Sequence, residues 1–323
     1  MEEQLTLLTV FGKNFSPYAV FTALGSILGL LVFVLRGRKL KSSCIVLTAL
    51  LSVPLCLLGA RTFYVMSRLG LFAEVGFNNF FRAQEPDYNI WGSVNGGAFW
   101  GAVAGGALAA LTAGRITGCR VSVVLDAMAP GAALALALSR FGEYSIGEGI
   151  GPDVSIPGLC FFPVAVVNEW EEWKYAVFML EGIAALVIFL VLLMPRKTER
   201  SGDRARLFLL LYSSCQILLE ALRRDNFLRW LFVRVSQVTA ALVLLGLFAF
   251  AVLRWSRKPQ KERMSINRVI VFGIVFLLLA GAVVALEFAV DKSPTLSVVM
   301  AYLLEACCAA GFGFVTYQVV MKN

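Results

Sequence analysis

The chain contains no histidine among its 323 residues. Histidine is the side chain that titrates nearest to neutral pH, and it is the commonest metal ligand in proteins. Its absence removes the usual general base and the usual metal ligand from any chemistry that the chain performs. The seven cysteines form no CxxC pair. We therefore expect neither a metal site nor a cofactor.

Charged residues are also scarce, at 15% of the chain, whereas hydrophobic residues make up 59%. Because soluble domains carry about 25% charged residues, this composition indicates an all-α polytopic membrane protein. The net charge of +8 is carried mainly by loops between apolar segments, which is typical of cytoplasmic loops and predicts no nucleic-acid partner. The acidic start, Met1 to Gln4, lacks the basic region of a cleaved signal peptide, so we expect none.

Apolar segments recur along the whole chain. A transmembrane helix needs about 20 predominantly apolar residues, and nine segments approach or exceed this length. They are Pro17–Leu35, Cys44–Met66, Trp91–Ala113, Val121–Leu138, Tyr175–Met194, Leu207–Leu222, Leu231–Leu253, Val269–Val290 and Leu296–Val320.

The loops between these segments alternate in charge. Basic residues follow the first, third, fifth and seventh segments, as at 36–41 and 254–268, and acidic residues concentrate in the intervening loops. The positive-inside rule then places the N-terminus outside and the C-terminus in the cytoplasm. An odd number of spans agrees with this orientation.

The most unusual stretch is Ser139–Gly151, which holds four glycines and the ionisable residues Arg140, Glu143 and Glu148 directly beside an apolar segment. Glycine at this density disfavours a helix. Irregular backbone at membrane depth is tolerated where it lines a protein-walled cavity, and ionisable groups there are usually paired and functional. We interpret this stretch as the floor of an active or binding site.

Polar residues interrupt three other segments, and two explanations are open for them. The three groups of interrupting residues are Arg61 and Tyr64; Asn95, Gly96 and Gly97; and Tyr212, Gln216, Glu220 and Arg223. The last four have spacings of 4, 4 and 3, which places them on one helical face. Such a face either lines a cavity or joins helices through hydrogen bonds. Because several apolar segments contain such polar residues, we favour an active or binding site.

Glycines of the third segment also have two interpretations. Gly97, Gly101, Gly105 and Gly106 either allow a neighbouring helix to approach closely or line the site, whereas packing does not explain Asn95. The several arginines indicate an anionic ligand, because a guanidinium binds phosphate in a planar fork. A phosphate reached from the outer leaflet suggests a phospholipid headgroup.

The motifs resemble those of the bacterial phosphatidylglycerol–prolipoprotein diacylglyceryl transferases over about Pro17 to Leu253. Residues 59–65 resemble the family's Gly-Ala-Arg-x-x-Tyr motif. Residues 126–131 resemble its Asp-x-x-Ala-Pro-Gly motif, which precedes the signature stretch. The stretch Ser139–Gly151 resembles the signature Gly-Arg-x-Gly-Asn-Phe-x-Asn-Gly-Glu-x-x-Gly, which it matches at Arg140, Gly142, Gly147, Glu148 and Gly151. Tyr212, Glu220 and Arg223 match Tyr-x-x-x-Arg-x-x-x-Glu-x-x-Arg.

The departures from the family pattern affect residues with a chemical role more than residues that pack. Asn95 stands where the family has its motif histidine, and Gln216 replaces an arginine. Glu143 and Ile146 replace the two asparagines of the signature, and Ser139 replaces the glycine before Arg140. In the fifth segment only Glu181 resembles the family's His-Pro-x-Gln-x-Tyr-Glu.

The resemblance implies transfer of a diacylglyceryl group from phosphatidylglycerol to the lipobox cysteine of a secretory precursor protein. On that basis Arg140, Glu143, Asn95 and Tyr212 are candidate catalytic residues. The candidate substrate-binding residues are Arg61, Gly96, Gly97, Gly142, Glu148, Gln216, Glu220 and Arg223. Arg140 would hold the phosphate, with Arg61 or Arg223 assisting, and Glu148 and Glu220 would orient the arginines. Glu143 is either a general base or a salt-bridge partner of Arg140.

The alternative function is a non-catalytic relative that binds phospholipid or lipidated precursor, and a transporter ranks last because no inverted repeat is visible. The resemblance further implies a seven-helix core with about two extra C-terminal helices. We expect a transferase-like membrane domain at 1–255, then a basic linker and transmembrane hairpin at 256–323. The expected location is the bacterial plasma membrane.

Overall fold

The computed structural model describes residues 8–10, 13–76, 80, 97–154, 156–168, 170–195, 200–225, 228–230, 233–257, 265–292 and 298–322. The chain divides into two compact units. The first holds residues up to Ala205 together with Arg224–Ser236, and the second holds Arg206–Arg223 and the chain from Gln237 onward.

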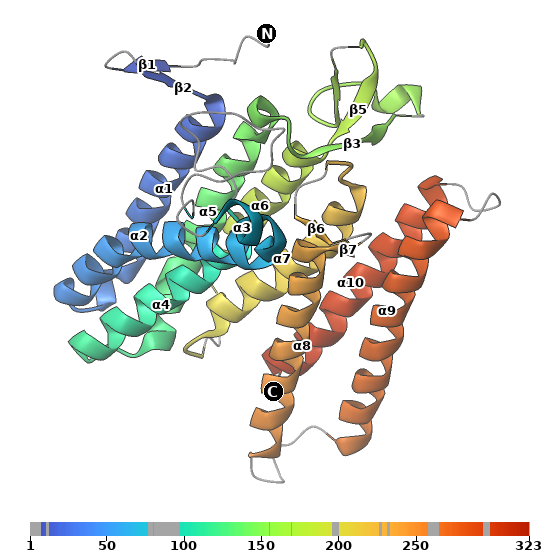
Figure 1. The fold of residues 1–323 in the computed structure, drawn as a ribbon. Coiled ribbons are helices and arrows are strands. Elements are labelled where there is room, and N and C mark those ends of the chain that lie inside the picture. Colours follow the sequence, from blue (N-terminus) through green and yellow to red (C-terminus); the bar gives the residue numbers. More distant parts are fainter. Residues whose placement is uncertain are drawn as a thin grey trace. The chain divides into compact units, whose positions relative to one another are not determined.

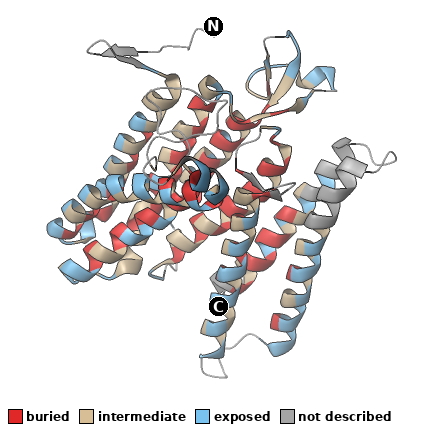
Figure 2. Ribbon diagram, in the orientation of Figure 1, coloured by how far each residue is buried: buried red, intermediate tan, exposed pale blue. Residues whose placement is uncertain are grey.

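The first unit is built from α1 (Pro17–Arg36), α2 (Ser42–Ser67), α4 (Phe99–Thr117), α5 (Val121–Gly142) and α6 (Val177–Leu193), shown in Figure 1. A short helix, α3 (Leu69–Val75), follows α2. Helix α5 packs against both α1 and α6, while α4 packs against α2. Buried residues accordingly run along α4 and α5, as Figure 2 shows in red.

Two of these helix pairs meet through glycine. A Cβ built on Gly29 of α1 would lie 2.6 Å from the backbone oxygen of Gly131 on α5. On the second pair, a Cβ on Gly101 or Gly105 of α4 would collide with the backbone of α2, at Gly59 and Leu55. The packing interpretation of Gly101 and Gly105 is therefore confirmed, because these backbones touch with no side chain between them.

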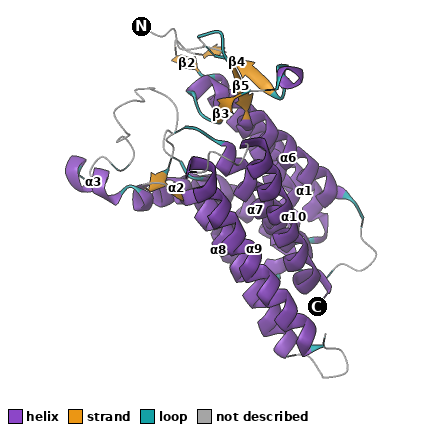
Figure 3. Cartoon of the chain, turned by 90° about the vertical axis from the view of Figure 1, so that its right-hand side faces the viewer, coloured by secondary structure: helices purple, strands orange, loops and turns teal. Residues whose placement is uncertain are grey.

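Short strands lie at the helix ends, as Figure 3 shows in orange. Strands β1 (Leu8–Val10) and β2 (Lys13–Phe15) pair before α1, and β6 (Arg229–Trp230) pairs with β7 (Val233–Arg234). An antiparallel sheet of order β3-β5-β4 is formed by Ile150–Asp153, Trp173–Ala176 and Ala165–Val167. Strand β5 leads directly into α6, so this sheet lies where a helix of the bundle begins.

The second unit contains most of α7 (Asp203–Leu222) and α8 (Val235–Ser256), with α9 (Ile266–Lys292) and α10 (Val298–Lys322). Phe248, Phe276 and Phe312 join three of these helices, with ring centroids 4.8 Å and 4.3 Å apart. Gly313 of α10 lies against Ser214 of α7, where an added Cβ would come 2.6 Å from the serine Oγ.

The all-α polytopic class is confirmed. Among the described residues, six helices are long and apolar enough to cross a membrane, and three shorter apolar stretches lie in α6, α9 and α10. Some boundaries differ from the prediction. Helix α4 begins at Phe99, after Gly97 and Ala98, rather than at Trp91, and Trp91 itself lies outside the described residues. The segment expected to begin at Tyr175 instead starts as strand β5, and helix α6 follows from Val177.

Candidate active site

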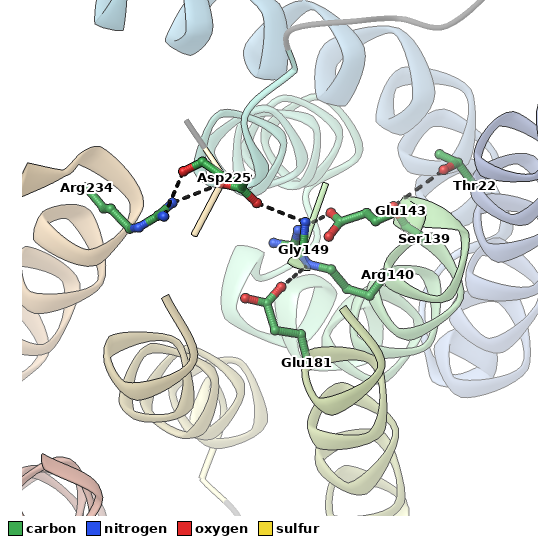
Figure 4. A network of polar contacts seen from close by, with 8 residues as sticks. All are labelled: Thr22, Ser139, Arg140, Glu143, Gly149, Glu181, Asp225 and Arg234. Atoms are coloured by element: carbon green, nitrogen blue, oxygen red, sulfur yellow. Dashed lines mark hydrogen bonds and ion pairs between the residues drawn. The ribbon is translucent and has the colours of Figure 1, made fainter. Parts of the chain in front are cut away.

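Arg140 lies at the centre of a buried charged cluster formed by the ends of two helices. Its Nε is 2.8 Å from Oε2 of Glu181 on α6, and its Nη1 donates to Oε1 of Glu143. The residues Arg140, Glu143 and Glu181 are 8%, 4% and 1% exposed. Because burying an isolated charge is costly, these opposite charges are retained together. Figure 4 shows the guanidinium between the two carboxylates.

The backbone of the signature stretch is partly helical, which corrects the expectation of irregular structure throughout. Helix α5 continues through Ser139 and Arg140 to Gly142, and a 3₁₀ turn follows at Glu143–Ile146. The irregular part begins at Gly147 and Gly149, whose φ angles of +70° and +74° favour glycine. A Cβ on Gly149 would lie 2.6 Å from Cβ of Phe178, so the turn also needs a small residue for space.

Helix α1 fixes this turn from the other side. The hydroxyl of Ser145 accepts a hydrogen bond from the Tyr18 backbone N–H at 3.0 Å and donates to the Gly142 carbonyl at 2.8 Å. The Thr22 hydroxyl donates to Ser139 Oγ at 3.4 Å. A Cβ on Gly142 would approach Cα of Tyr18 to 2.7 Å, so Gly142 serves close packing in the structure.

Glu148 lies beside the cluster, half-buried, and its backbone N–H donates to the Glu143 carbonyl at 3.3 Å. The structure thus brings together the predicted residues Arg140, Gly142, Glu143 and Glu148. The carboxylates of Glu143 and Glu181 contact Arg140 directly. Glu143 therefore forms the salt bridge that was one of its two predicted roles.

A second ion pair extends the cluster through the backbone. The Gly149 N–H donates to Oδ2 of Asp225 at 2.8 Å, and Oδ1 of Asp225 accepts from Nη1 of Arg234 at 3.0 Å. Arg234 also donates to the Asp225 carbonyl at 2.8 Å. Across the residues of Figure 4, three carboxylates face two guanidinium groups. The formal charge is therefore −1, and a phosphate that reaches Arg140 must share its five N–H donors with carboxylates.

Arg61 belongs to a different constellation in the same unit. It is 1% exposed, its Nε donates to the Phe80 carbonyl at 2.5 Å, and its guanidinium lies over the rings of Tyr64 and Phe72 at 5.1 and 5.6 Å from their centroids. Such cation–π contacts stabilise a desolvated guanidinium.

Gly97 directly precedes a residue that contacts α2, the helix that carries Arg61. The N–H of Ala98, the next residue, donates to the Ala60 carbonyl of α2 at 3.0 Å. Asn95 and Gly96 lie outside the described residues.

The remaining predicted residues lie in the second unit, three on α7 and Arg223 directly after it. Tyr212, Gln216, Glu220 and Arg223 are 2%, 2%, 2% and 3% exposed, so the polar face inferred from their spacing is buried. Phe208 stacks on Tyr212 with ring centroids 6.2 Å apart, and the Arg223 N–H donates to the Glu220 carbonyl at 3.2 Å.

Three residues of the charged cluster were not predicted as site residues: Glu181, Asp225 and Arg234. Glu181 had a signal, because it is the one acidic residue inside the apolar segment Tyr175–Met194 and therefore needed a partner. Asp225 and Arg234 follow α7 and precede α8, a position from which the sequence gives no indication of contact with Gly149.

Comparison with known proteins places this site in a family. The family model for prolipoprotein diacylglyceryl transferase matches residues 6–255. The chain belongs to this family of transferases. It is 27% identical over 256 residues to the phosphatidylglycerol–prolipoprotein diacylglyceryl transferase of Bacillus licheniformis, covering 76% of this chain and 89% of the relative.

Two further relatives carry the same name. The protein of Frankia alni is 31% identical over 266 residues, covering 80% of this chain and 67% of the relative. That of Clostridioides difficile is 28% identical over 242 residues, with coverages of 74% and 90%. The family match spans the whole charged cluster and the polar face of α7, and it ends before α9 and α10. The multi-pass helices and these bacterial relatives indicate a bacterial membrane protein.

Proposed function

We propose that the protein transfers the diacylglyceryl group of phosphatidylglycerol to the lipobox cysteine of a secretory precursor protein. The family match over residues 6–255 is the observation that carries the proposal. The signature arginine supports it, because Arg140 is retained and lies buried at the end of α5, where two carboxylates orient its guanidinium.

The proposed reaction is a displacement at the glyceryl carbon that bears the phosphate. The precursor thiol loses its proton to a base, and the thiolate sulfur forms a bond to this carbon. The bond between the carbon and the phosphate oxygen breaks, and glycerol phosphate leaves with the electron pair. The proton ends on the base or on the departing phosphate. Donors that face the phosphate stabilise the charge that develops on it.

The residues divide into donors and the groups that orient them. Arg140 would contact the phosphate, with Arg61 and Arg223 as further guanidinium donors and Tyr212 as a hydroxyl donor. Glu148 and Glu220 were predicted as positioning residues, and Glu181 joins them because it directly contacts Arg140. Gly96, Gly97 and Gly142 would allow close approach of backbone, and Asn95 would present an amide where the family has histidine.

The reaction needs a base for the thiol proton. Glu143 is the carboxylate that this chain has gained, and its contact with Arg140 supports a role as ion-pair partner. A partner role for Glu143 leaves the thiol proton to water, to the phosphate itself or to another residue.

The alternative is a binding protein that holds phospholipid or a lipidated precursor without chemistry. It is favoured by the neutral amide of Gln216 on α7 and by the carboxylates that already occupy Arg140. A labelled precursor peptide, incubated with purified protein and phosphatidylglycerol, separates the two. We expect a mass gain of one diacylglyceryl group; binding of both partners with no mass gain would contradict transfer and support the binding role.

The proposed arrangement in the cell follows from the loop charges. We infer a plasma-membrane protein with the N-terminus outside and the C-terminus in the cytoplasm. Residues 1–255 form the transferase domain in this proposal, and residues 256–323 form a basic linker with a transmembrane hairpin. The family match, which ends at residue 255, supports this division.

A further inference from the structure

Two buried polar side chains on α7 have no hydrogen-bond partner within the part of the chain that the structure describes. They are Gln216, at both Oε1 and Nε2, and Ser213, at Oγ. Gln216 is 2% exposed and Ser213 is 0% exposed. Because they are three positions apart, they lie one turn from each other on the same side of the helix.

Leaving these groups unsatisfied is costly. A buried polar group without a partner has lost its hydrogen bonds to water without replacement, and most buried polar groups in proteins are hydrogen-bonded. Neighbouring residues follow that rule: the Ser214 hydroxyl donates to the Leu210 carbonyl at 2.8 Å, and the Gln237 amide donates to the Ile217 carbonyl at 3.3 Å. The chain therefore satisfies a serine and a glutamine nearby but not the pair on the buried face.

The chemistry of the pair indicates what it would bind. The amide of Gln216 offers two donors and one acceptor, and the Ser213 hydroxyl offers a donor and acceptors, all without charge. A phosphate oxygen only accepts hydrogen bonds and is better matched by a guanidinium. A group that both donates and accepts, such as a set of hydroxyls, complements the pair.

We propose that Gln216 and Ser213 form a subsite for the uncharged, hydroxyl-bearing part of a lipid headgroup. Phosphatidylglycerol carries this chemistry through its terminal glycerol, and glycosyl diacylglycerols carry it through their sugar. The inference rests on the proposed function, whose lipid it specifies. In this proposal the pair contacts the headgroup hydroxyls and does not contact the phosphate.

Lipid binding to the purified full-length protein tests the subsite without any transfer step. The probes are phosphatidylglycerol, glucosyl diacylglycerol and phosphatidylmethanol, which keeps the phosphodiester but has no headgroup hydroxyl. Gln216→Met and Ser213→Ala remove the pair's polar groups at nearly constant volume. The matched controls are Ser214→Ala and Gln237→Met, which remove the same groups from residues whose hydrogen bonds are satisfied inside the chain.

We expect Gln216→Met to weaken phosphatidylglycerol binding about tenfold, as loss of one to two hydrogen bonds implies, and to leave phosphatidylmethanol binding unchanged. If Gln216→Met also loses binding of glucosyl diacylglycerol, the subsite binds sugar headgroups as well as glycerol. If the wild-type protein does not bind that lipid, the subsite is specific for the glycerol headgroup. Equal weakening for phosphatidylmethanol, or no weakening for any hydroxyl-bearing lipid, would overturn the proposal.

Thermal unfolding without added lipid gives a second readout. Gln216→Met should unfold at the wild-type temperature or above it, because an unsatisfied amide has been replaced by an apolar group. Gln237→Met should unfold at a lower temperature and keep the wild-type preference for phosphatidylglycerol. If Gln216→Met were destabilised as much as Gln237→Met, Gln216 would be a structural residue and the subsite would be excluded. A protein that binds lipid but shows no transfer would disprove the proposed reaction and leave this test intact.

Discussion

At the scale of single residues, Arg140 illustrates how neighbours set the role of a charged group. A guanidinium with no carboxylate nearby would attract phosphate strongly. Here Glu143 and Glu181 contact it from the turn after α5 and from α6. They fix its orientation, and they also compete with any anion for its donors. The affinity of the site for phosphate should therefore depend on both carboxylates.

The first prediction compares the two carboxylates. We expect Glu143→Gln and Glu181→Gln to lower transfer activity to similar extents and to destabilise the protein by about 3 kcal/mol each, because each leaves Arg140 with one buried ion-pair partner fewer. Precursor maturation in a transferase-deficient strain and thermal unfolding of the purified variants measure the two effects. A stable Glu143→Gln variant without activity, beside an active Glu181→Gln variant, would instead identify Glu143 as the base.

At the scale of elements, the sheet β3-β5-β4 carries its own ion-pair network outside the helices. Lys174 of β5 lies opposite Asp153 of β3, with which it forms an ion pair, and its Nζ is 3.2 Å from Oε2 of Glu172. Hydrogen bonds that Lys174 donates to Asp153 and then to Glu172 raise the pKa of Lys174. Hydrogen bonds from Asn168 and then Lys174 lower the pKa of Glu172.

The second prediction follows from the signs of these shifts. A lowered pKa for Glu172 stabilises the sheet above the ordinary glutamate pKa, about 4.3, and this contribution is lost as the pH falls through the folded-state value. A raised pKa for Lys174 stabilises it below the ordinary lysine pKa, about 10.4, and this contribution is lost as the pH rises through the folded-state value.

Hydrogen exchange of the β5 amides, corrected for intrinsic rates, measures this dependence. Protection should be highest between these limits and should fall outside them. In the Lys174→Met variant, the protection of the β5 amides should change less with pH at both the acidic and the alkaline end. Between about pH 5 and pH 10, inside both ordinary pKa values, we expect the wild-type protection to be constant, so the decisive differences lie below and above this range. An unchanged profile in the variant would show that the network does not stabilise the sheet.

Comparison of elements shows where sequence patterns succeed. Length and apolar composition placed α1, α2 and α5 through α10 within a few residues, since a span is defined by its own residues. The strands were missed, because β3 and β4 are three or four residues long and form only when β5 lies between them. The same limit applies to Asp225, whose contact with Gly149 joins positions 76 residues apart.

The spacing of α7 shows what a pattern can and cannot give. It predicted that Tyr212, Gln216, Glu220 and Arg223 share a face, and all four are buried. Spacing carries no information on which groups are satisfied, because hydrogen-bond partners come from other parts of the chain. The unsatisfied amide of Gln216 emerged only from the structure.

At the scale of the whole molecule, the proposed orientation places native cysteines on opposite sides of the membrane. Cys160 lies in the acidic segment that connects α5 and α6. Cys119 lies between α4 and α5, beside Arg120. Both thiols are free. Hydrogen bonds with Thr117 and with the Lys41 backbone lower the pKa of the Cys119 thiol, which raises its thiolate fraction and its reactivity.

The third prediction uses these two thiols in a protein whose other five cysteines are replaced by alanine. A membrane-impermeant maleimide should label Cys160 in intact cells, or in spheroplasts where an outer membrane blocks the reagent. Cys119 should be labelled only after the plasma membrane is permeabilised, and then faster at mildly alkaline pH. Single-cysteine variants that keep one thiol each assign the label. Labelling of Cys119 before permeabilisation, with Cys160 protected, would reverse the orientation.

The glycine contacts described for α1 with α5 and for α2 with α4 have a consequence for the route of the lipid. Gly29 meets Gly131, and Gly101 meets Gly59, with backbone atoms in direct contact. These two helix pairs cannot separate to admit an acyl chain without breaking the closest contacts between their helices. If the protein transfers a diacylglyceryl group as proposed, a phospholipid entering from the bilayer would therefore pass between other helices than these two pairs.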